Sequence, residues 1–252
     1  MTDILIQGIQ GRMGHVLCDL IAQRSDCRVV GGIDRTPAAG PVPVVSSFDE
    51  LKVKADVLID FSSPEATRNA IAYCEKVKMP CVICTTGLTA EDNAALQRLS
   101  ESVPVFKSAN MSMGINLLAE LAQRAAKVLG LDYDIEIIEK HHHNKVDAPS
   151  GTALMLADAI CEASPEEYNY VYDRHAVRQM RDPHEIGLHS VRGGSIVGEH
   201  EVLFCGPDEV ITLSHSAASR SVFANGAINA AVFLAGKEPG MYSMRELLEG
   251  AL

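Results

Sequence analysis

Residues 4–14 read Ile4-Leu5-Ile6-Gln7-Gly8-Ile9-Gln10-Gly11-Arg12-Met13-Gly14, a short apolar run followed by three glycines at intervals of three. The apolar run predicts a buried strand. Apolar residues at helical spacing over residues 13–21 then predict a helix, and a second apolar segment ends at Asp34. Strand, glycine turn, helix and strand within about thirty residues are typical of a βαβ unit that binds a dinucleotide.

The glycine turn has a physical role in such a unit. Without a Cβ, the backbone can approach a pyrophosphate, which the N-terminus of the following helix stabilises. Asp34 lies about 20 residues beyond Gly14, where a carboxylate can accept hydrogen bonds from the adenosine ribose. Arg35 could instead pair with a 2′-phosphate, so NADH and NADPH both remain candidate cofactors. The alternative is a purely structural turn with a capping Asp and a solvated Arg.

Beyond Asp34 the chain keeps alternating between apolar strands and helices. The expected elements are strands at 56–61, 81–84 and 103–106 and helices at 64–78 and 90–100. This alternation predicts an α/β fold, a Rossmann-type doubly wound parallel sheet, which binds ligands at the carboxyl ends of its strands. We assign the dinucleotide-binding domain to residues 1–111 plus 220–252, because an apolar helix at 221–235 suits packing back onto this domain.

The middle of the chain has a different pattern. A helix at 111–130 precedes a strand at 133–139, and residues 165–188 are polar enough for a long surface loop. The chain then turns β-rich, with a hairpin predicted around Gly193-Gly194 and further strands at 202–205 and 210–215. We therefore predict a second α+β domain, residues 112–219, built on a mostly antiparallel sheet and serving substrate binding and oligomerisation.

The stretch Lys140-His141-His142-His143-Asn144-Lys145 is a local cationic cluster in a chain of net charge −11. Such groups can hold an anion or transfer a proton near neutral pH. Ser150 is expected to cap a helix beginning with Gly151 and Thr152, and a helix N-terminus binds carboxylates. Two anion-binding features so close together predict a small substrate with more than one carboxylate. A zinc site and a solvated basic patch are the alternatives.

The composition excludes several classes of function. The chain has 22 Lys and Arg against 33 Asp and Glu, which disfavours nucleic acid or an anionic membrane as a partner. Neither a membrane-spanning apolar run nor a secretory signal is evident, so we expect a cytoplasmic protein. Seven scattered cysteines suit reduced thiols. Cys81-x-x-Cys84 invites a redox or zinc interpretation, but residues i and i+3 of a strand face opposite ways, so no metal site is predicted.

Several motifs together resemble the 4-hydroxy-tetrahydrodipicolinate reductase family, formerly called dihydrodipicolinate reductase. The resemblance covers almost the whole chain in order, through the segments 8–14, 85–87, 140–153, 190–194, 198–200 and 220–227. It implies NAD(P)H-dependent reduction of (2S,4S)-4-hydroxy-2,3,4,5-tetrahydrodipicolinate to (S)-2,3,4,5-tetrahydrodipicolinate with loss of water, in the diaminopimelate route of lysine biosynthesis. It also implies a homotetramer assembled through the second-domain sheet.

The resemblance further implies roles for individual residues. His141 corresponds to a proton donor or acceptor, and Lys145 to a proton donor. The substrate, a small cyclic dicarboxylate, would be held by His142, Gly151 and Thr152. The implied cofactor contacts are Gly8, Ile9, Gln10, Gly11, Arg12, Met13, Asp34, Arg35, Cys84, Thr85, Thr86, Ser108, Ala109, Asn110 and Met111. Two other functions stay open from the sequence: a dehydrogenase of another amino-acid precursor, and a non-catalytic regulator that senses a dinucleotide.

Overall fold

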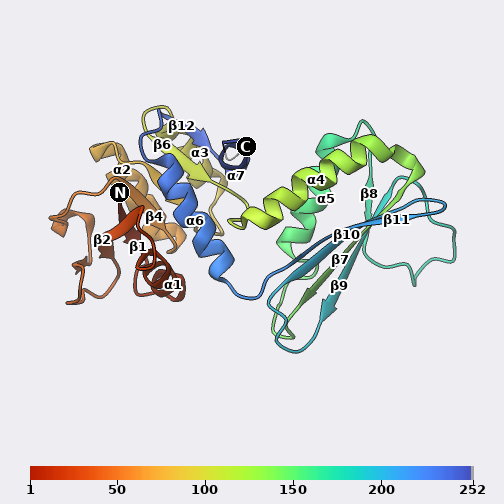
Figure 1. Cartoon of the computed structure of the whole chain (residues 1–252), viewed down its shortest axis with the longest axis horizontal. Helices are drawn as coiled ribbons and strands as arrows, with labels where there is room; N and C mark the ends of the chain where they lie inside the picture. Colours follow the sequence, from red (N-terminus) through yellow and green to blue (C-terminus); the bar gives the residue numbers. More distant parts are fainter. Residues whose placement is uncertain (251–252) are drawn as a thin grey trace. The chain divides into compact units, whose positions relative to one another are not determined.

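The computed structural model describes residues 1–250, and the chain divides into two compact units (Figure 1). The first unit comprises Met1–Ser112 together with the chain from Ser221 onward. The second unit is Met113–Arg220. No helix within residues 1–250 has the length and apolar character needed to cross a membrane.

The first unit contains a parallel sheet of seven strands. In spatial order its strands are β12 (Gly240–Tyr242), β6 (Pro104–Lys107), β5 (Cys81–Ile83), β4 (Val57–Asp60), β1 (Thr2–Gln7), β2 (Cys27–Ile33) and β3 (Val44–Val45). Because the strands are parallel, the loops that follow β1, β2, β4, β5 and β6 all emerge at one edge. The predicted doubly wound fold is confirmed.

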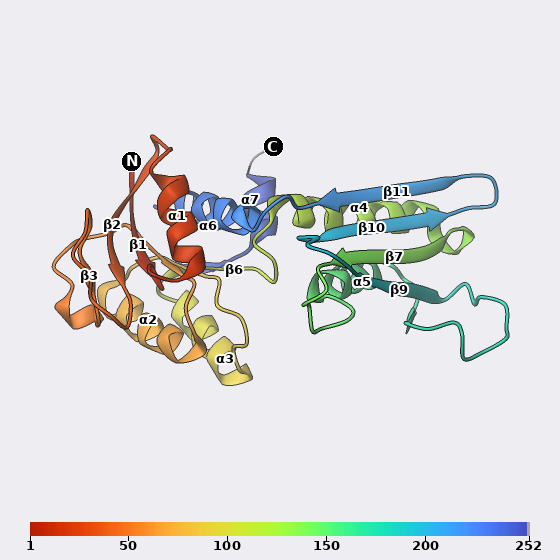
Figure 2. The ribbon, with the colours of Figure 1, turned by 90° about the horizontal axis from the view of Figure 1, so that it is seen from below.

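Helices cover both faces of this sheet, α1 and α6 on one and α2 and α3 on the other (Figure 2). The helical elements are α1 (Arg12–Ile21), η1 (Phe48–Glu50), α2 (Pro64–Val77), α3 (Ala90–Ser100), α6 (Ser221–Leu234) and α7 (Met244–Glu249). Local sequence fixes where some of them begin: the Ser63 hydroxyl caps α2 ahead of a proline, and Thr89 and Asp92 form a capping box on α3.

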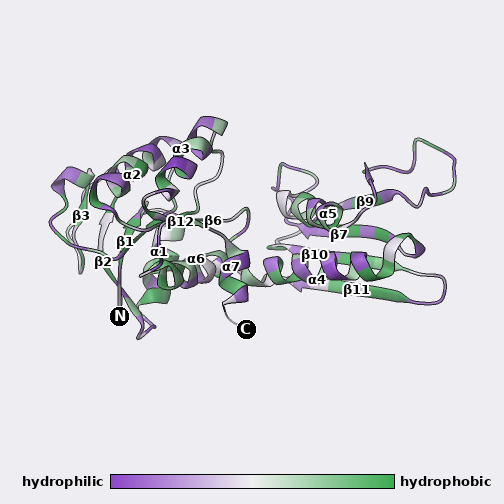
Figure 3. Cartoon of the chain, turned by 90° about the horizontal axis from the view of Figure 1, so that it is seen from above, coloured by the Kyte–Doolittle hydropathy of each residue, from purple (hydrophilic) through white to green (hydrophobic). Residues whose placement is uncertain are grey.

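The second unit packs two helices on one five-stranded sheet (Figure 1). The strands, in spatial order, are β11 (Val210–Ser216), β10 (Glu199–Cys205), β7 (Asp134–His141), β9 (Glu185–Arg192) and β8 (Asn169–Val171). The helices are α4 (Met113–Leu129) and α5 (Gly151–Ala163), with η2 (Gly130–Asp132) between α4 and β7. Hydrophobic and hydrophilic residues are mixed along β7 (Figure 3), and every second side chain of the strand is buried, including the hydrophilic Glu139 and His141.

The strand pairing in this sheet corrects one prediction. The β9 and β10 strands do not form a hairpin around Gly193-Gly194, because β7 lies between them, parallel to β9 and antiparallel to β10. The sheet is therefore mixed rather than mostly antiparallel: the β10–β11 pair predicted around the turn at 206–209 and the β7–β10 pair are antiparallel, whereas the β7–β9 and β9–β8 pairs are parallel. The predicted surface loop at 165–188 was too long, since it contains β8 and the start of β9.

Candidate active site

A cleft of about 940 Å³ opens in the first unit beside the glycine turn. The predicted cofactor residues that line it are Gly8, Gln10, Gly11, Asp34 and Arg35. Gly8 has φ +79°, and a Cβ there would lie 2.4 Å from the Phe61 carbonyl oxygen, so only glycine fits. The α1 helix begins directly after Gly11, which offers no side-chain cap to the first N–H groups of the helix.

Asp34 is held in place by backbone donors at the end of β2. Its carboxylate accepts a hydrogen bond from Gln10 N at 2.9 Å and from Arg35 N at 2.8 Å. The carboxylate thereby joins the glycine turn to the second strand, at the position where an adenosine ribose is expected. The stacked rings of Phe48 and Tyr73, 4.4 Å apart, also line the cleft. Sequence reasoning missed this aromatic pair, because the two residues lie on separate elements.

A buried carboxylate organises the next loops along the sheet edge. Asp60, at the end of β4, is fully buried and accepts hydrogen bonds from Thr67 Oγ1 at 2.5 Å and Thr85 Oγ1 at 3.0 Å, and another from the Ser62 hydroxyl. Burial raises the pKa of Asp60, although these hydroxyl donors act against that shift. Thr85 also accepts a hydrogen bond from Ser62 N at 3.1 Å, which ties the loops after β4 and β5 together.

The remaining predicted cofactor residues follow the same edge but do not line this cleft. Ile9 is buried against Gly32, while Arg12 and Met13 open α1. Cys84, Thr85 and Thr86 follow β5, and Ser108, Ala109, Asn110 and Met111 follow β6. In the second of these loops Ser108 Oγ donates to Asn110 O at 2.9 Å, and Asn110 Oδ1 accepts from Ser112 N at 2.8 Å. Whether these loops contact the cofactor stays a prediction.

In the second unit, a buried glutamate lies beneath the histidine cluster. Glu139 has 0 % of its surface exposed, and its Oε2 lies 2.6 Å from His141 Nδ1. The Arg192 guanidinium donates to both carboxylate oxygens, at 2.7 and 2.8 Å. Ser150 N donates to Oε1 at 3.1 Å. One carboxylate thus connects the end of β7, the end of β9 and the residue that caps α5.

The charge state of Glu139 follows from these contacts. Burial raises its pKa, but the hydrogen bonds from Arg192, Ser190 and His141 outweigh that effect and lower the pKa to about 2. Glu139 is therefore ionised at neutral pH. A buried charge of this kind is stable only because it is paired and hydrogen-bonded on several sides.

His200 on β10 lies beside Glu139 and His141. Its Nε2 is 2.9 Å from Ser150 Oγ, which in turn accepts a hydrogen bond from Ala153 N at 3.1 Å. Its ring makes an edge contact with that of His141, with centroids 5.2 Å apart. Burial lowers the pKa of His200 to about 4, so the ring is neutral at physiological pH.

The loop after β7 carries the other predicted substrate residues. Lys145 Nζ pairs with Asp147 at 2.8 Å, and this contact lowers the pKa of Asp147. His142 Nδ1 is buried and has no hydrogen-bond partner among residues 1–250. Gly151 and Thr152 open α5 behind the Ser150 cap, as predicted. His141, His142, Lys145 and the α5 N-terminus thus all lie on the continuous stretch from the end of β7 to the start of α5.

Other members of the cationic cluster lie elsewhere. His143 is exposed, and Lys140 is on the opposite side of β7, paired with Glu201 at 2.7 Å and Glu199 at 3.3 Å. The glutamate, arginine and histidine that surround His141 were missed as site residues. A signal for Glu139 was present, because the alternation Ile135-x-Ile137-x-Glu139 places it on the apolar face of the strand.

The cysteine pair and the histidines show no metal geometry. Within residues 1–250, no three His, Cys, Asp or Glu side chains are grouped so as to hold a metal ion. Cys81 is fully buried in β5, and desolvation, with a smaller contribution from Asp60, raises the pKa of Cys84 well above its usual value. A thiol in that environment is not a reactive thiolate.

Comparison with known proteins identifies the family. Sequence models of dihydrodipicolinate reductase match both parts of the chain, the N-terminus model over residues 2–111 and the C-terminus model over residues 114–248. The chain belongs to the dihydrodipicolinate reductase family. The predicted family and fold class are thus both confirmed.

Relatives of this reductase family match the chain over its whole length. A protein of Caldanaerobacter subterraneus named 4-hydroxy-tetrahydrodipicolinate reductase is 51% identical over 99% of both chains. One of Clostridium tetani with the same name is 44% identical, over 97% of this chain and 96% of the relative. Among solved structures, a dipicolinate-bound dihydrodipicolinate reductase from Paenisporosarcina sp. TG-14 matches with a TM-score of 0.81 and 26% identity, over 96% of this chain and 97% of that one.

Proposed function

We propose that the chain is an NAD(P)H-dependent reductase that converts (2S,4S)-4-hydroxy-2,3,4,5-tetrahydrodipicolinate to (S)-2,3,4,5-tetrahydrodipicolinate with loss of water, in the diaminopimelate route to lysine. The observation that carries this proposal is the full-length similarity to curated reductases of that name, 51% and 44% identical. The stretch that carries His141, His142, Lys145 and the α5 N-terminus is consistent with this reaction, because a dianionic substrate needs cations and N–H donors together.

The first unit fits a reduced nicotinamide dinucleotide. Gly8 leaves no room for a side chain against Phe61, and α1 begins at the turn, as a pyrophosphate site requires. Asp34 suits the ribose hydroxyls, and Arg35 beside it suits a 2′-phosphate, so we propose that both NADH and NADPH are used. When bound, the nicotinamide supplies the hydride, and the loops after β5 and β6 complete the cofactor contacts.

The second unit supplies substrate binding and proton transfer. His142, whose Nδ1 has no partner among the described residues, and the N–H groups of Gly151 and Thr152 hold the carboxylates. Loss of water needs a proton on the departing hydroxyl and the release of a proton from the ring, and the reduction adds one further proton to the ring beside the hydride. We assign these transfers to His141, as donor or acceptor, and to Lys145, as donor.

We further propose that the protein is a cytoplasmic homotetramer. In the second unit, α4 and α5 both pack on one face of the sheet (Figure 1). The opposite face carries the exposed Val191 and Val210 beside charged side chains of β7 and β10. A face of this kind suits assembly between copies of the chain. Sedimentation of the purified chain over a range of concentrations tests this assembly, and a monomer at all concentrations would exclude it.

In the activity test, the upstream synthase produces the unstable substrate in the assay mixture. Purified protein is mixed with the upstream synthase and its substrates, and oxidation of NADH or NADPH is followed by absorbance. We expect oxidation only when the synthase is active, and inhibition by planar pyridine-2,6-dicarboxylate. Oxidation driven instead by homoserine or meso-diaminopimelate would favour a dehydrogenase of another precursor. Cofactor binding without any turnover would favour a dinucleotide-sensing regulator.

A further inference from the structure

Glu139 joins the end of β7, the end of β9 and the start of α5. It contacts His141 at the end of its own strand, the Arg192 guanidinium on β9 and the backbone N–H of Ser150 before α5. Arg192 also donates to the Asp147 carbonyl oxygen at 2.6 Å, which fixes the loop between His141 and α5. A change in the Glu139 carboxylate would therefore act on the imidazole and on the helix N-terminus together.

The chemistry of this contact decides which ring nitrogen of His141 carries a proton. An ionised carboxylate only accepts hydrogen bonds, and Arg192 on two sides keeps Glu139 ionised. The 2.6 Å contact to Nδ1 is therefore an N–H donated by the imidazole. In the neutral ring this leaves Nε2 without a proton, free to accept one, and in the imidazolium form Nε2 carries the proton that can be given away.

We propose that Glu139 is a positioning residue for the proton-transfer step: it holds His141 in the Nδ1–H tautomer, makes Nε2 the atom that exchanges a proton with the substrate, and stabilises the imidazolium. The inference rests on the proposed function, in which His141 transfers a proton. Arg192 contributes to the same positioning. Without its charge the buried carboxyl group would be easier to protonate, and a protonated carboxyl group could donate a hydrogen bond to Nδ1 instead of accepting one from it.

Charged and titratable groups approach His141 from every neighbouring element. Arg192 comes from β9, His200 from β10 and the Lys145–Asp147 pair from the following loop. His215 on β11 stands opposite His200, one strand further away. Glu139 makes the direct contact with a ring nitrogen of His141 and is ionised. Glu139 is thus an ionised group in direct hydrogen-bond contact with the imidazole of His141.

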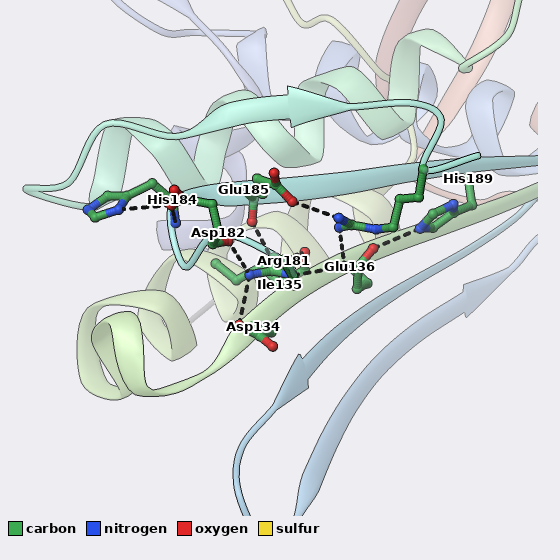
Figure 4. Close-up of polar contacts among 9 residues, drawn as sticks. Asp134, Ile135, Glu136, Arg181, Asp182, His184, Glu185 and His189 are labelled. Carbon is green, nitrogen blue, oxygen red and sulfur yellow. Dashed lines mark hydrogen bonds and ion pairs between the residues drawn. The ribbon is translucent and has the colours of Figure 1, made fainter. Parts of the chain in front are cut away.

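Glu136, on the same strand, provides a matched control for the loss of a partly buried ionic cluster without a catalytic role. Glu136 lies on the other face of β7, and its carboxylate also contacts two arginines and a histidine: Arg174 at 2.8 Å, Arg181 at 3.1 Å and His189 at 2.7 Å (Figure 4). Its side chain is 20% exposed. Glu136→Gln therefore removes a similar ionic cluster from the same strand, outside the proposed site.

The first test reads the tautomer directly and needs no enzyme activity. The ¹⁵N shifts of the histidine rings are recorded across the pH range, and the His141 signals are assigned from the spectrum of His141→Gln. In the wild-type chain we expect neutral His141 to carry its proton on Nδ1. In Glu139→Gln we expect the neutral ring to shift towards the Nε2–H form, while Glu136→Gln leaves it unchanged. A wild-type ring protonated on Nε2 alone would overturn the proposal, even if the variant failed to fold.

The second test is kinetic. We expect Glu139→Gln to lower kcat by about 100-fold, the size of a general acid–base contribution. We also expect the limb of its kcat/KM profile near neutral pH to move to lower pH, because the imidazolium loses its stabilising charge. Glu136→Gln, compared at the same thermal stability and oligomeric state, should keep the wild-type profile. If Glu139→Gln lowered the stability but left the pH profile of kcat/KM unshifted, Glu139 would have only a structural role and the proposal would be wrong.

The two tests separate the inference from the function beneath it. If the wild-type chain shows the Nδ1–H tautomer but no reductase activity, the proposed function fails and the positioning of His141 stands. If the chain is an active reductase and His141 is held in the other tautomer, the function stands and the role of Glu139 is wrong.

Discussion

Glu139 on β7 lies directly opposite His200 on β10, and the surroundings of the two side chains keep the carboxyl group ionised and the imidazole neutral. Arginine and other donors lower the pKa of the carboxyl to about 2, whereas desolvation lowers the pKa of the imidazole to about 4. An ionised acid therefore sits beside a neutral base at physiological pH. The nearby carboxylate favours a protonated His200, but desolvation and the neighbouring His141 outweigh it.

We predict that this pair makes the fold sensitive to mild acid. The folded-state pKa of His200 is below the ordinary 6.5, so the unfolded chain binds the proton first and stability is lost as pH falls from 6.5 towards 4. Between pH 7 and pH 5 the protonation of His200 in the unfolded chain lowers the free energy of unfolding by about 2 kcal/mol. For Glu139 the loss comes later, as pH falls from 4.5 towards 2.

Calorimetry at pH 7 and pH 5 checks the first stage. We expect the unfolding midpoint of His200→Gln to fall less between these pH values than that of the wild type. The exposed His175, replaced by Gln, serves as the matched control and should keep the wild-type dependence. Equal pH dependence in the wild type and His200→Gln would show that His200 is not the group responsible.

Much of the architecture was predictable from local sequence, because it depends on short-range signals. The βαβ unit follows from the glycine turn and apolar periodicity, and α3 was predicted at its observed bounds, Ala90–Ser100. The position of β7 between β9 and β10 could not be predicted in this way. The Gly193-Gly194 turn looks like a hairpin locally, but Gly193 N donates to His141 O, some fifty residues earlier in the chain.

The site was predictable in part for the same reason. Residues 140–152 form one continuous segment, so His141, Lys145 and the α5 N-terminus could be associated from sequence. Arg192 and His200 lie in two of the motif segments, 190–194 and 198–200, but they reach His141 only through strand pairing, so the sequence alone assigned them no role at the site. Glu139 carried a weak signal in the sequence, because it is a charged residue on the buried side of an alternating strand. The role of such a residue depends on the partner that neutralises it, which the sequence does not identify.

A separate prediction concerns the two proposed catalytic residues. His141→Ala should lower kcat by about 100-fold, the usual contribution of a positioned acid–base group. Lys145→Ala should raise KM as well as lower kcat, because it removes both a cation near the substrate carboxylates and a proton donor. The exposed neighbour His143, replaced by Ala, is the control and should behave as wild type. Steady-state kinetics with the coupled synthase gives both constants, and wild-type values in either variant remove that residue from the mechanism.

Cofactor preference should depend on Arg35 at the rim of the cleft. Its guanidinium can pair with a 2′-phosphate, whereas NADH offers it only hydroxyls. We expect Arg35→Ala to weaken NADPH binding by about tenfold or more, the size of a lost charge-assisted hydrogen bond, and to leave NADH binding nearly unchanged. Titration calorimetry with both cofactors measures this, with the exposed Lys54→Ala as a charge-matched control. An equal loss for both cofactors would place Arg35 outside the 2′-phosphate site.

The last prediction uses the contact between Gly198 and the ring nitrogen of His141 that Glu139 does not bind. A Cβ on Gly198 would lie 3.1 Å from Nε2 and 3.5 Å from Cδ2 of His141. Gly198→Ala would therefore place a methyl group against the proposed proton-exchanging atom, with a crowding that a small movement of the ring can relieve. We expect kcat to fall by about tenfold or more, since the ring is displaced from its working position. Cofactor affinity should not change, because Gly198 belongs to the second unit and the dinucleotide cleft to the first.

Gly193→Ala, where an added Cβ meets nothing within 4 Å, is the matched control. Kinetics of Gly198→Ala equal to those of Gly193→Ala would mean that Nε2 needs no open space on this side.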